Sequence, residues 1–415
     1  MRAEEFLIAH GMQPERIEPA ECAPRFVAAM EKGLRGEEDG LPMLPTYLKA
    51  DGRVPRAVPA AVIDAGGTNF RRALVTFGDG DYRVEELRKT TMPGVTAPDD
   101  FDGFIRYTAD ALMPLMDRVQ HVGFCFSYLA VMTPDRDGCD PRFTKQVKIS
   151  GCAGRHLCGE LAGELARRGV TGKSFTLLND TAAVLLGVSA LLDKDSYDGI
   201  LGLVSGTGTN TCCMLPLSAI PKLGGGEGKM LVNLESGYMK DLPRGDFDRL
   251  LDEASNDPGR GWHEKMTSGA YLGELCRISL CAAADQGLIS QCIRGVPHMD
   301  ASQADAWCDG QGLEGLAESE ADRVFIQTVC RAVFDRAARC VASNLGALLL
   351  LTGAGREGPA CICAEGSLFL KSRRFRPALE KHLGAYADAI GRRFEFRTAE
   401  DTTLLGSAAA ALLND

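Results

Sequence analysis

Residues 62–77 read Val-Ile-Asp-Ala-Gly-Gly-Thr-Asn-Phe-Arg-Arg-Ala-Leu-Val-Thr-Phe. An apolar run, a polar glycine turn and a second, alternating run follow one another, and this order predicts a β-hairpin. Glycine at positions 66 and 67 permits positive φ and lets an anion approach the backbone amides, while Thr68 and Asn69 add side-chain donors. The turn is therefore a candidate binding site for a polyphosphate.

Asp64 ends the first run of this hairpin and faces the same turn. A carboxylate beside phosphates is chemically reasonable when Mg²⁺ or its water shell lies between them. The alternative is a tight hairpin with an exposed aspartate, and the loop alone leaves both interpretations open.

Length and charge restrict the class of protein. A chain of 415 residues exceeds what one hydrophobic core usually organises, so two lobes are predicted. A formal net charge of −10 is a poor match for nucleic acid or an anionic membrane and favours a small-molecule partner. The sequence leaves the oligomeric state open.

The cysteines and the N-terminal residues indicate the compartment. Fifteen cysteines, an odd number without Cys-x-x-Cys spacing, are typical of free thiols in a reducing cytoplasm. The start of the chain does not resemble a signal peptide, and the most apolar stretch, 345–351, is much shorter than a membrane span. We therefore expect a cytoplasmic location and no membrane partner.

A second glycine turn repeats the plan of the first. The apolar run 200–204 leads into Ser-Gly-Thr-Gly-Thr-Asn at 205–210 and a further strand at 211–215. Two such turns in separate halves predict a duplicated fold that grips one nucleotide from both sides. A Walker A loop at 169–174 is rejected, because Arg167 stands where its first glycine belongs.

Asn179-Asp180-Thr181 lies between a predicted strand at 174–178 and a predicted helix at 182–192. A carboxylate at such a junction can act as a general base, or it can simply cap the helix. Local sequence leaves both roles open and favours the cap.

Two further carboxylates, Glu235 and Glu264, lie in the second half of the chain. Each alone is typical of a solvated surface acid, but carboxylates and amides together can bind the vicinal hydroxyls of a sugar. Elsewhere we predict a buried strand at 122–126, a loop at 133–155 and a polar insertion at 297–321.

In this order the motifs resemble the eukaryotic-type hexokinases, members of the actin, heat-shock ATPase and sugar-kinase superfamily. The resemblance extends from about residue 58 to the C-terminus, at the length of a single hexokinase unit. The matching segments are Asp64–Arg71, Leu178–Ala182, Gly206–Asn210, Asn233–Gly237, Asn256–Tyr271 and Cys363–Phe369.

The resemblance implies a duplicated, two-lobed α/β fold of the ribonuclease-H-like, actin-like ATPase type, with a deep cleft between the lobes. The small lobe would comprise 58–178 and the C-terminal helix 400–415, and the large lobe 1–57 and 179–399. It also implies transfer of the ATP γ-phosphoryl group to the 6-hydroxyl of a hexose such as glucose, the first step of glycolysis.

The same resemblance assigns roles to individual residues. Asp180 and Lys145 would be catalytic, with Asp180 as the base. The hexose would be bound by Ser127, Thr144, Lys145, Asn179, Asp180, Asn210, Glu235 and Glu264. ATP would be bound by Asp64, Gly66, Gly67, Thr68, Asn69, Arg71, Gly206, Thr207, Gly208, Gly366, Ser367 and Thr403. Mg²⁺ would arrive with ATP near Asp64, and no direct protein ligand is predicted for it.

The chain departs from the family pattern at the sugar loop, where Tyr128-Leu129 replace Phe-Pro after Ser127. Loss of the proline predicts a more mobile loop and altered discrimination among hexoses. A non-catalytic sugar and nucleotide sensor on the same fold is the main alternative to the enzyme. A superfamily ATPase of structural or chaperone type is a second alternative, but it would have no need of Glu235 and Glu264.

Overall fold

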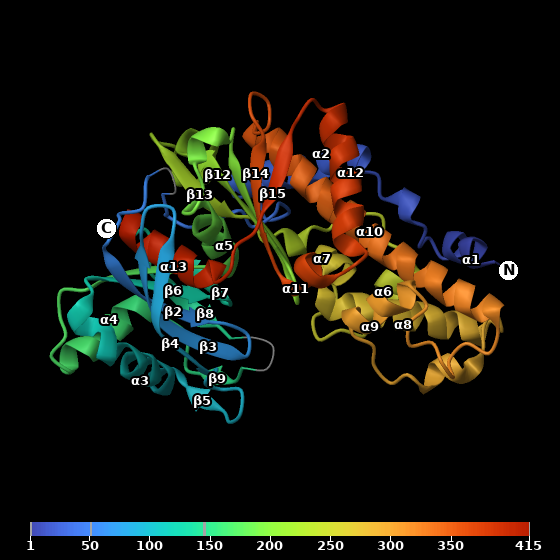
Figure 1. The fold of residues 1–415 in the computed structure, drawn as a ribbon, viewed down its shortest axis with the longest axis horizontal. Helices are drawn as coiled ribbons and strands as arrows, with labels where there is room; N and C mark the ends of the chain where they lie inside the picture. Colours follow the sequence, from blue (N-terminus) through green and yellow to red (C-terminus); the bar gives the residue numbers. More distant parts are fainter. Residues whose placement is uncertain (1, 50–51, 144–146, 415) are drawn as a thin grey trace.

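The computed structural model describes residues 2–49, 52–143 and 147–414. Figure 1 shows two lobes, with one β-sheet in the lobe at the left, a second β-sheet at the top centre, and a large group of helices at the right. The helices are α1 (Ala3–Ala9), α2 (Pro19–Arg35), α3 (Phe101–Leu112), α4 (Leu157–Arg167), α5 (Asp180–Ser189), α6 (Asp246–Glu253), α7 (Trp262–Thr267), α8 (Gly269–Asp285), α9 (Ala301–Cys308), α10 (Glu320–Thr352), α11 (Ser367–Lys371), α12 (Phe375–Ala389) and α13 (Thr402–Leu413).

The strands form two main sheets and two short pairs. They are β1 (Leu44–Pro45), β2 (Pro59–Ala65), β3 (Asn69–Phe77), β4 (Tyr82–Thr91), β5 (Asp99–Asp100), β6 (His121–Phe126), β7 (Leu129–Met132), β8 (Gly138–Arg142), β9 (Ile149–Ser150), β10 (Ser174–Leu178), β11 (Ile200–Ser205), β12 (Thr209–Pro216), β13 (Lys229–Asn233), β14 (Ala360–Glu365) and β15 (Phe394–Arg397).

The two main sheets share one topology. The first has the order β10-β6-β2-β3-β4, and the second has the order β15-β14-β11-β12-β13 with β1 added at its edge. In each, three consecutive antiparallel strands are extended by two parallel strands on the side of the first. This equivalence confirms the predicted duplication.

Helices α5 and α13 pack against each other between the sheets (Figure 1). Their backbones are too close for side chains at two glycines. A Cβ atom on Gly187 would lie 2.2 Å from the Thr402 carbonyl oxygen, and one on Gly406 would lie 1.9 Å from that of Ala183. Helix α13 also packs on β6 and β2, so the C-terminal residues belong to the first lobe.

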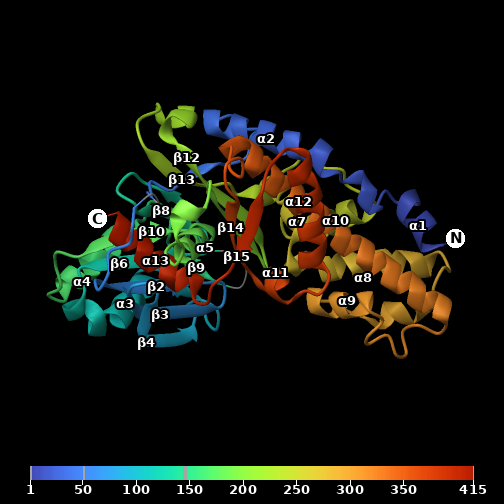
Figure 2. The same cartoon turned by 45° about the horizontal axis from the view of Figure 1, so that its top comes forward.

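The second lobe is built around α10, a 33-residue helix whose apolar residues are largely buried. Helices α2 and α12 lie along it, as Figure 2 shows. Arg336 of α10 is buried and makes a two-point ion pair with Asp248 of α6, at 3.1 and 2.5 Å. A buried charge requires such a partner.

Three local predictions need correction. The predicted loop 133–155 contains β8 and β9, because short strands that pair within a loop carry little periodicity. The polar insertion 297–321 contains α9, which is capped by the Asp300 side chain. The helix predicted at 182–192 begins at Asp180 instead. Among the described residues, no helix has the length and apolar character needed to cross a membrane.

Candidate active site

Two three-residue turns occupy equivalent positions in the two sheets. Residues 66–68 join β2 to β3, and residues 206–208 join β11 to β12. The first backbone amide of each turn donates across it, from Gly66 to the Asn69 carbonyl and from Gly206 to that of Gly208, at 2.9 Å in both. The duplicated fold therefore presents two similar glycine turns.

The first turn does not use the positive φ that glycine permits, since neither Gly66 nor Gly67 has it. A Cβ atom on Gly206 would lie 3.2 Å from the Cα atom of Gly366 and from the amide nitrogen of Ser367. A Cβ atom on Gly67 would meet nothing within 4 Å. The second turn thus packs on the 366–367 segment, and the first is open at Gly67.

Asp64 is buried, so the alternative of an exposed hairpin aspartate is wrong. Its Oδ2 atom accepts hydrogen bonds from Arg71 Nε at 2.9 Å and from Thr403 Oγ1 at 3.0 Å. Arg71 Nη2 also donates to both partners, with 2.7 Å to Thr403 Oγ1. The first turn is thereby tied to the start of α13. The neighbouring Thr68 and Asn69 side chains are exposed and bonded to each other at 3.2 Å.

Asn179, and not Asp180, caps helix α5. Its side-chain oxygen accepts from the Thr181 amide at 2.9 Å, which is the standard capping bond. Asp180 is the first residue of the helix and accepts from the Thr181 hydroxyl at 3.2 Å. The capping role that local sequence favoured for Asp180 is therefore filled by its neighbour.

Asn210, Asn233 and Glu235 form one hydrogen-bonded cluster at the ends of β12 and β13. The Glu235 Oε1 atom accepts from Asn233 Nδ2 at 2.7 Å and from Asn210 Nδ2 at 3.1 Å. The Asn210 side-chain oxygen accepts from the Ser236 amide at 3.2 Å, which fixes the loop. Glu235 itself has a φ of 56°, a strained value for a residue with a side chain.

Glu264 lies against this cluster and against the second glycine turn. A Cβ atom on Gly208 would approach Glu264 Oε1 to 2.7 Å, and one on Gly237 would lie 3.1 Å from the Glu264 Cβ atom. The adjacent Lys265 is buried and bonded to Asp252 at 2.7 Å, so it anchors the segment that carries Glu264.

The carboxyl groups of this site influence one another. Burial, and then the charges of Asp180 and Glu264, raise the pKa of Glu235 to about 7, although the amide hydrogen bonds lower it. Asp180, Glu235 and Glu264 are therefore close enough for electrostatic interaction. Perturbed carboxyl groups that converge in this way are typical of functional sites.

Sequence reasoning missed Glu365, the last residue of β14. Burial, followed by the charge of Asp180, raises its pKa to about 7, while Arg71 lowers the value. Its Oε2 atom is buried and accepts no hydrogen bond from the described residues. A carboxylate at a strand end beside Gly366 was the available signal. Asn233 was also not predicted as a site residue, although it lies in the same motif as Glu235, two residues before it.

Ser127 follows β6, and its amide donates to the Ala65 carbonyl at 3.1 Å. The neighbouring Tyr128 is buried, packs on Phe126 and Phe143, and donates to the Gly66 carbonyl at 2.8 Å. Tyr128 thus anchors the sugar loop to the first glycine turn, whereas the effect of losing the proline at position 129 stays a prediction. Thr144 and Lys145 lie outside the described residues.

A cavity of about 300 Å³ adjoins the second glycine turn. Its lining includes Thr207 and Ser367, two residues predicted to bind ATP. The remaining lining comes mainly from α8, α9 and α11, and the α9 part was not foreseen. It comprises Gly269, Ala270, Asp300, Ala301, Ser302, Asp305, Leu368, Lys371 and Ser372.

The fold and the site together define a two-lobed kinase of the actin-like superfamily. Paired glycine turns beside a cavity suit a nucleoside triphosphate, and a cluster of carboxylates and amides suits a polyhydroxylated acceptor. Family models described as hexokinase match residues 4–190 and 200–413. The chain belongs to the hexokinase family, and its activity is the ATP-dependent phosphorylation of a hexose.

The chain covers most of the length of its plant and yeast relatives. Hexokinase-1 of Nicotiana tabacum is 29% identical over 95% of this chain and 87% of its own. Glucokinase-1 of Saccharomyces cerevisiae is 28% identical over 96% of this chain and 94% of its own. A solved hexokinase from Schistosoma mansoni in complex with glucose aligns with a TM-score of 0.79, at 22% identity over 99% of this chain and 100% of that structure. The structural likeness confirms the predicted fold class.

Proposed function

We propose that Asp180 is the general base that accepts the proton of the hexose 6-hydroxyl as that oxygen attacks the γ-phosphoryl group. The observation that supports this role is the capping of α5 by Asn179, which leaves no need for Asp180 as a cap. Its charge also acts on Glu235 on one side and Glu365 on the other. A sugar hydroxyl is a weak nucleophile, so positioning and a base are what its transfer chemistry requires.

Asn210, Glu235 and Glu264 are proposed to bind the sugar hydroxyls from the second lobe. Ser127, Thr144 and Lys145 would contribute from the first, with Asn179 at the junction. The cluster of Asn210, Asn233 and Glu235 supports this assignment, because its hydrogen bonds fix the carboxylate before a sugar arrives. Such preorganisation reduces the cost of ordering on binding.

ATP is proposed to place its phosphates between the two glycine turns and its nucleoside in the cavity beside Thr207 and Ser367. Mg²⁺ would accompany it, held mainly through water. Asp64, Asp180 and Asp401 lie close enough for their charges to act on Glu365, and such carboxylates suit the water shell of Mg²⁺; the described residues contain no group of three or more potential ligands for direct coordination. When bound, the ion would neutralise phosphate charge.

Glucose, glycolysis and a cytoplasmic location complete the proposal. The glucose complex of the Schistosoma mansoni hexokinase and the glucokinase name of the yeast relative support the substrate. All fifteen cysteines are unpaired, which supports a reducing compartment.

Substitution of Asp180 by Asn tests the base. We expect turnover to fall by roughly 10²–10⁴ with hexose affinity within a few-fold of wild type. Asp79→Asn, an exposed carboxylate in the β3–β4 turn, is the matched control. Near-normal turnover of Asp180→Asn in a coupled assay with glucose, mannose, fructose and glucosamine would reject the assignment.

A further inference from the structure

Tyr128 connects two parts of the site that the sequence treats separately. It follows Ser127 of the sugar loop, and its hydroxyl donates to the carbonyl oxygen of Gly66, the first residue of the 66–68 turn, at 2.8 Å. Tyr128 is only 6% exposed, and its ring centroid lies 5.3 Å from that of Phe126 and 5.2 Å from that of Phe143. Phe143 directly precedes the proposed sugar residue Thr144.

The hydrogen bond from Tyr128 to Gly66 is made in addition to the backbone hydrogen bonds that hold the turn. The Ser127 amide donates to the Ala65 carbonyl at 3.1 Å, which continues the pairing of β2 with β6. On its other side, the turn accepts from the Met92 amide at the Thr68 carbonyl, at 3.0 Å. The Gly66 carbonyl lies between these two anchors, and the Tyr128 hydroxyl is its described side-chain partner.

The direction of this carbonyl fixes the next amide. In a planar trans peptide, the C=O of one residue and the N–H of the next point in opposite directions. Since the Gly66 carbonyl points at Tyr128, the Gly67 amide points away from it. On Gly67 an added Cβ atom would meet nothing within 4 Å, so the surroundings of this residue are open.

We propose that Tyr128 is a positioning residue that aims the Gly67 amide at a phosphate of the nucleotide. It thereby links the sugar loop to nucleotide binding. The inference rests on the proposed function of the 66–68 turn. Because the family pattern has Phe at this position, the hydroxyl and its effect belong to this chain and not to the pattern. A phenyl ring without the hydroxyl would keep its packing but would no longer fix the orientation of the peptide between Gly66 and Gly67.

Tyr128→Phe removes the hydroxyl and little else. The KM for ATP and the dissociation constant of a non-hydrolysable ATP analogue, measured by calorimetry with and without glucose, should both rise roughly five-fold. The KM for glucose should stay within two-fold. Tyr107→Phe is the matched control, since its hydroxyl bonds to Thr90 at 2.6 Å elsewhere in the same lobe. It should change neither constant.

Three outcomes would overturn the inference. They are an unchanged KM for ATP, an equal rise of both KM values, or an effect of Tyr128→Leu that Tyr128→Phe does not share. The last outcome would assign the role to ring packing. Failure of the proposed role of the 66–68 turn is distinguishable, because Gly67→Pro, which removes the amide itself, would then also leave the KM for ATP unchanged.

Discussion

Replacement of Glu365 by Gln should stabilise the protein, and more so at alkaline pH. The carboxyl group is largely buried, its Oε2 atom has no hydrogen-bond partner among the described residues, and its pKa is raised from 4.5 to about 7. The unfolded chain would ionise Glu365 near its ordinary pKa, whereas the folded protein keeps it protonated until near pH 7. Folding therefore binds a proton between these two values.

The direction of the pH effect follows from this bound proton. Below about pH 4.5 Glu365 is protonated in both the folded and the unfolded state, so the Glu365→Gln variant differs little in stability from the wild type. As pH rises from about 4.5 to 7, the unfolded wild-type chain loses the proton first, so the wild type loses stability relative to the variant. The difference then levels off. The full pKa difference corresponds to about 3 kcal/mol, and we expect about 1–3 kcal/mol because the group is partly exposed.

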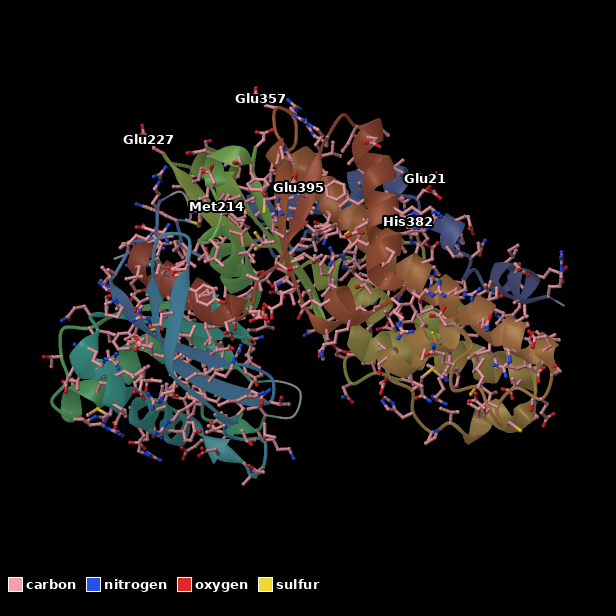
Figure 3. The ribbon with its side chains drawn as sticks, viewed as in Figure 1. Glu21, Met214, Glu227, Glu357, His382 and Glu395 are labelled. Atoms are coloured by element: carbon pink, nitrogen blue, oxygen red, sulfur yellow. The ribbon has the colours of Figure 1, made fainter. Side chains whose placement is uncertain are left out.

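Thermal unfolding of both proteins at pH 5, 6, 7 and 8 measures the effect. The melting temperature of Glu365→Gln should exceed that of the wild type increasingly from pH 5 to 8. Glu357→Gln is the control, since Glu357 lies in the exposed loop before β14 and points outward in Figure 3. A difference that is constant with pH, or that shrinks toward pH 8, would refute the reasoning.

Two further predictions concern the sugar side. Because the pKa of Glu235 is raised to about 7, the fraction of this residue in the carboxylate form, which accepts hydrogen bonds, increases with pH. The dissociation constant for glucose, measured by calorimetry, should therefore fall about ten-fold between pH 6 and 8. Glu235→Gln should abolish this pH dependence, and an equal dependence in both proteins would contradict a role for Glu235 in glucose binding. In Gly208→Ala the new Cβ atom would lie 2.7 Å from Glu264 Oε1 and displace it, so the KM for glucose should rise at least ten-fold. Gly163→Ala is the control, because Gly163 in α4 has open space around it and the KM should not change. Equal KM values in the two variants would show that glucose binding does not depend on this position of the Glu264 carboxylate.

The fold could be predicted to a large extent because it is encoded locally twice. Two glycine turns, each between apolar strands, identified the duplication, and the sheets confirm it. The elements that were missed include β4, β8, β9, β15 and α9, which are short, polar or largely exposed, so their apolar periodicity is too weak to detect. Their stability comes from pairing and packing with residues distant in the chain.

The sequence by itself determined the family, the two turns and the candidate carboxylates other than Glu365, because these depend on residue types at fixed spacing. Only the tertiary structure decided which partners and surroundings each carboxylate has. The cap of α5 is Asn179, whose side chain accepts from the Thr181 amide, and Asp64 is bound by Thr403, which lies 339 residues away. Burial of Glu235 and Glu365, which moves their pKa values, and the bond from Tyr128 to Gly66 likewise arise from separate segments meeting in space. Desolvation and hydrogen-bond direction depend on that meeting, and no local sequence pattern specifies them.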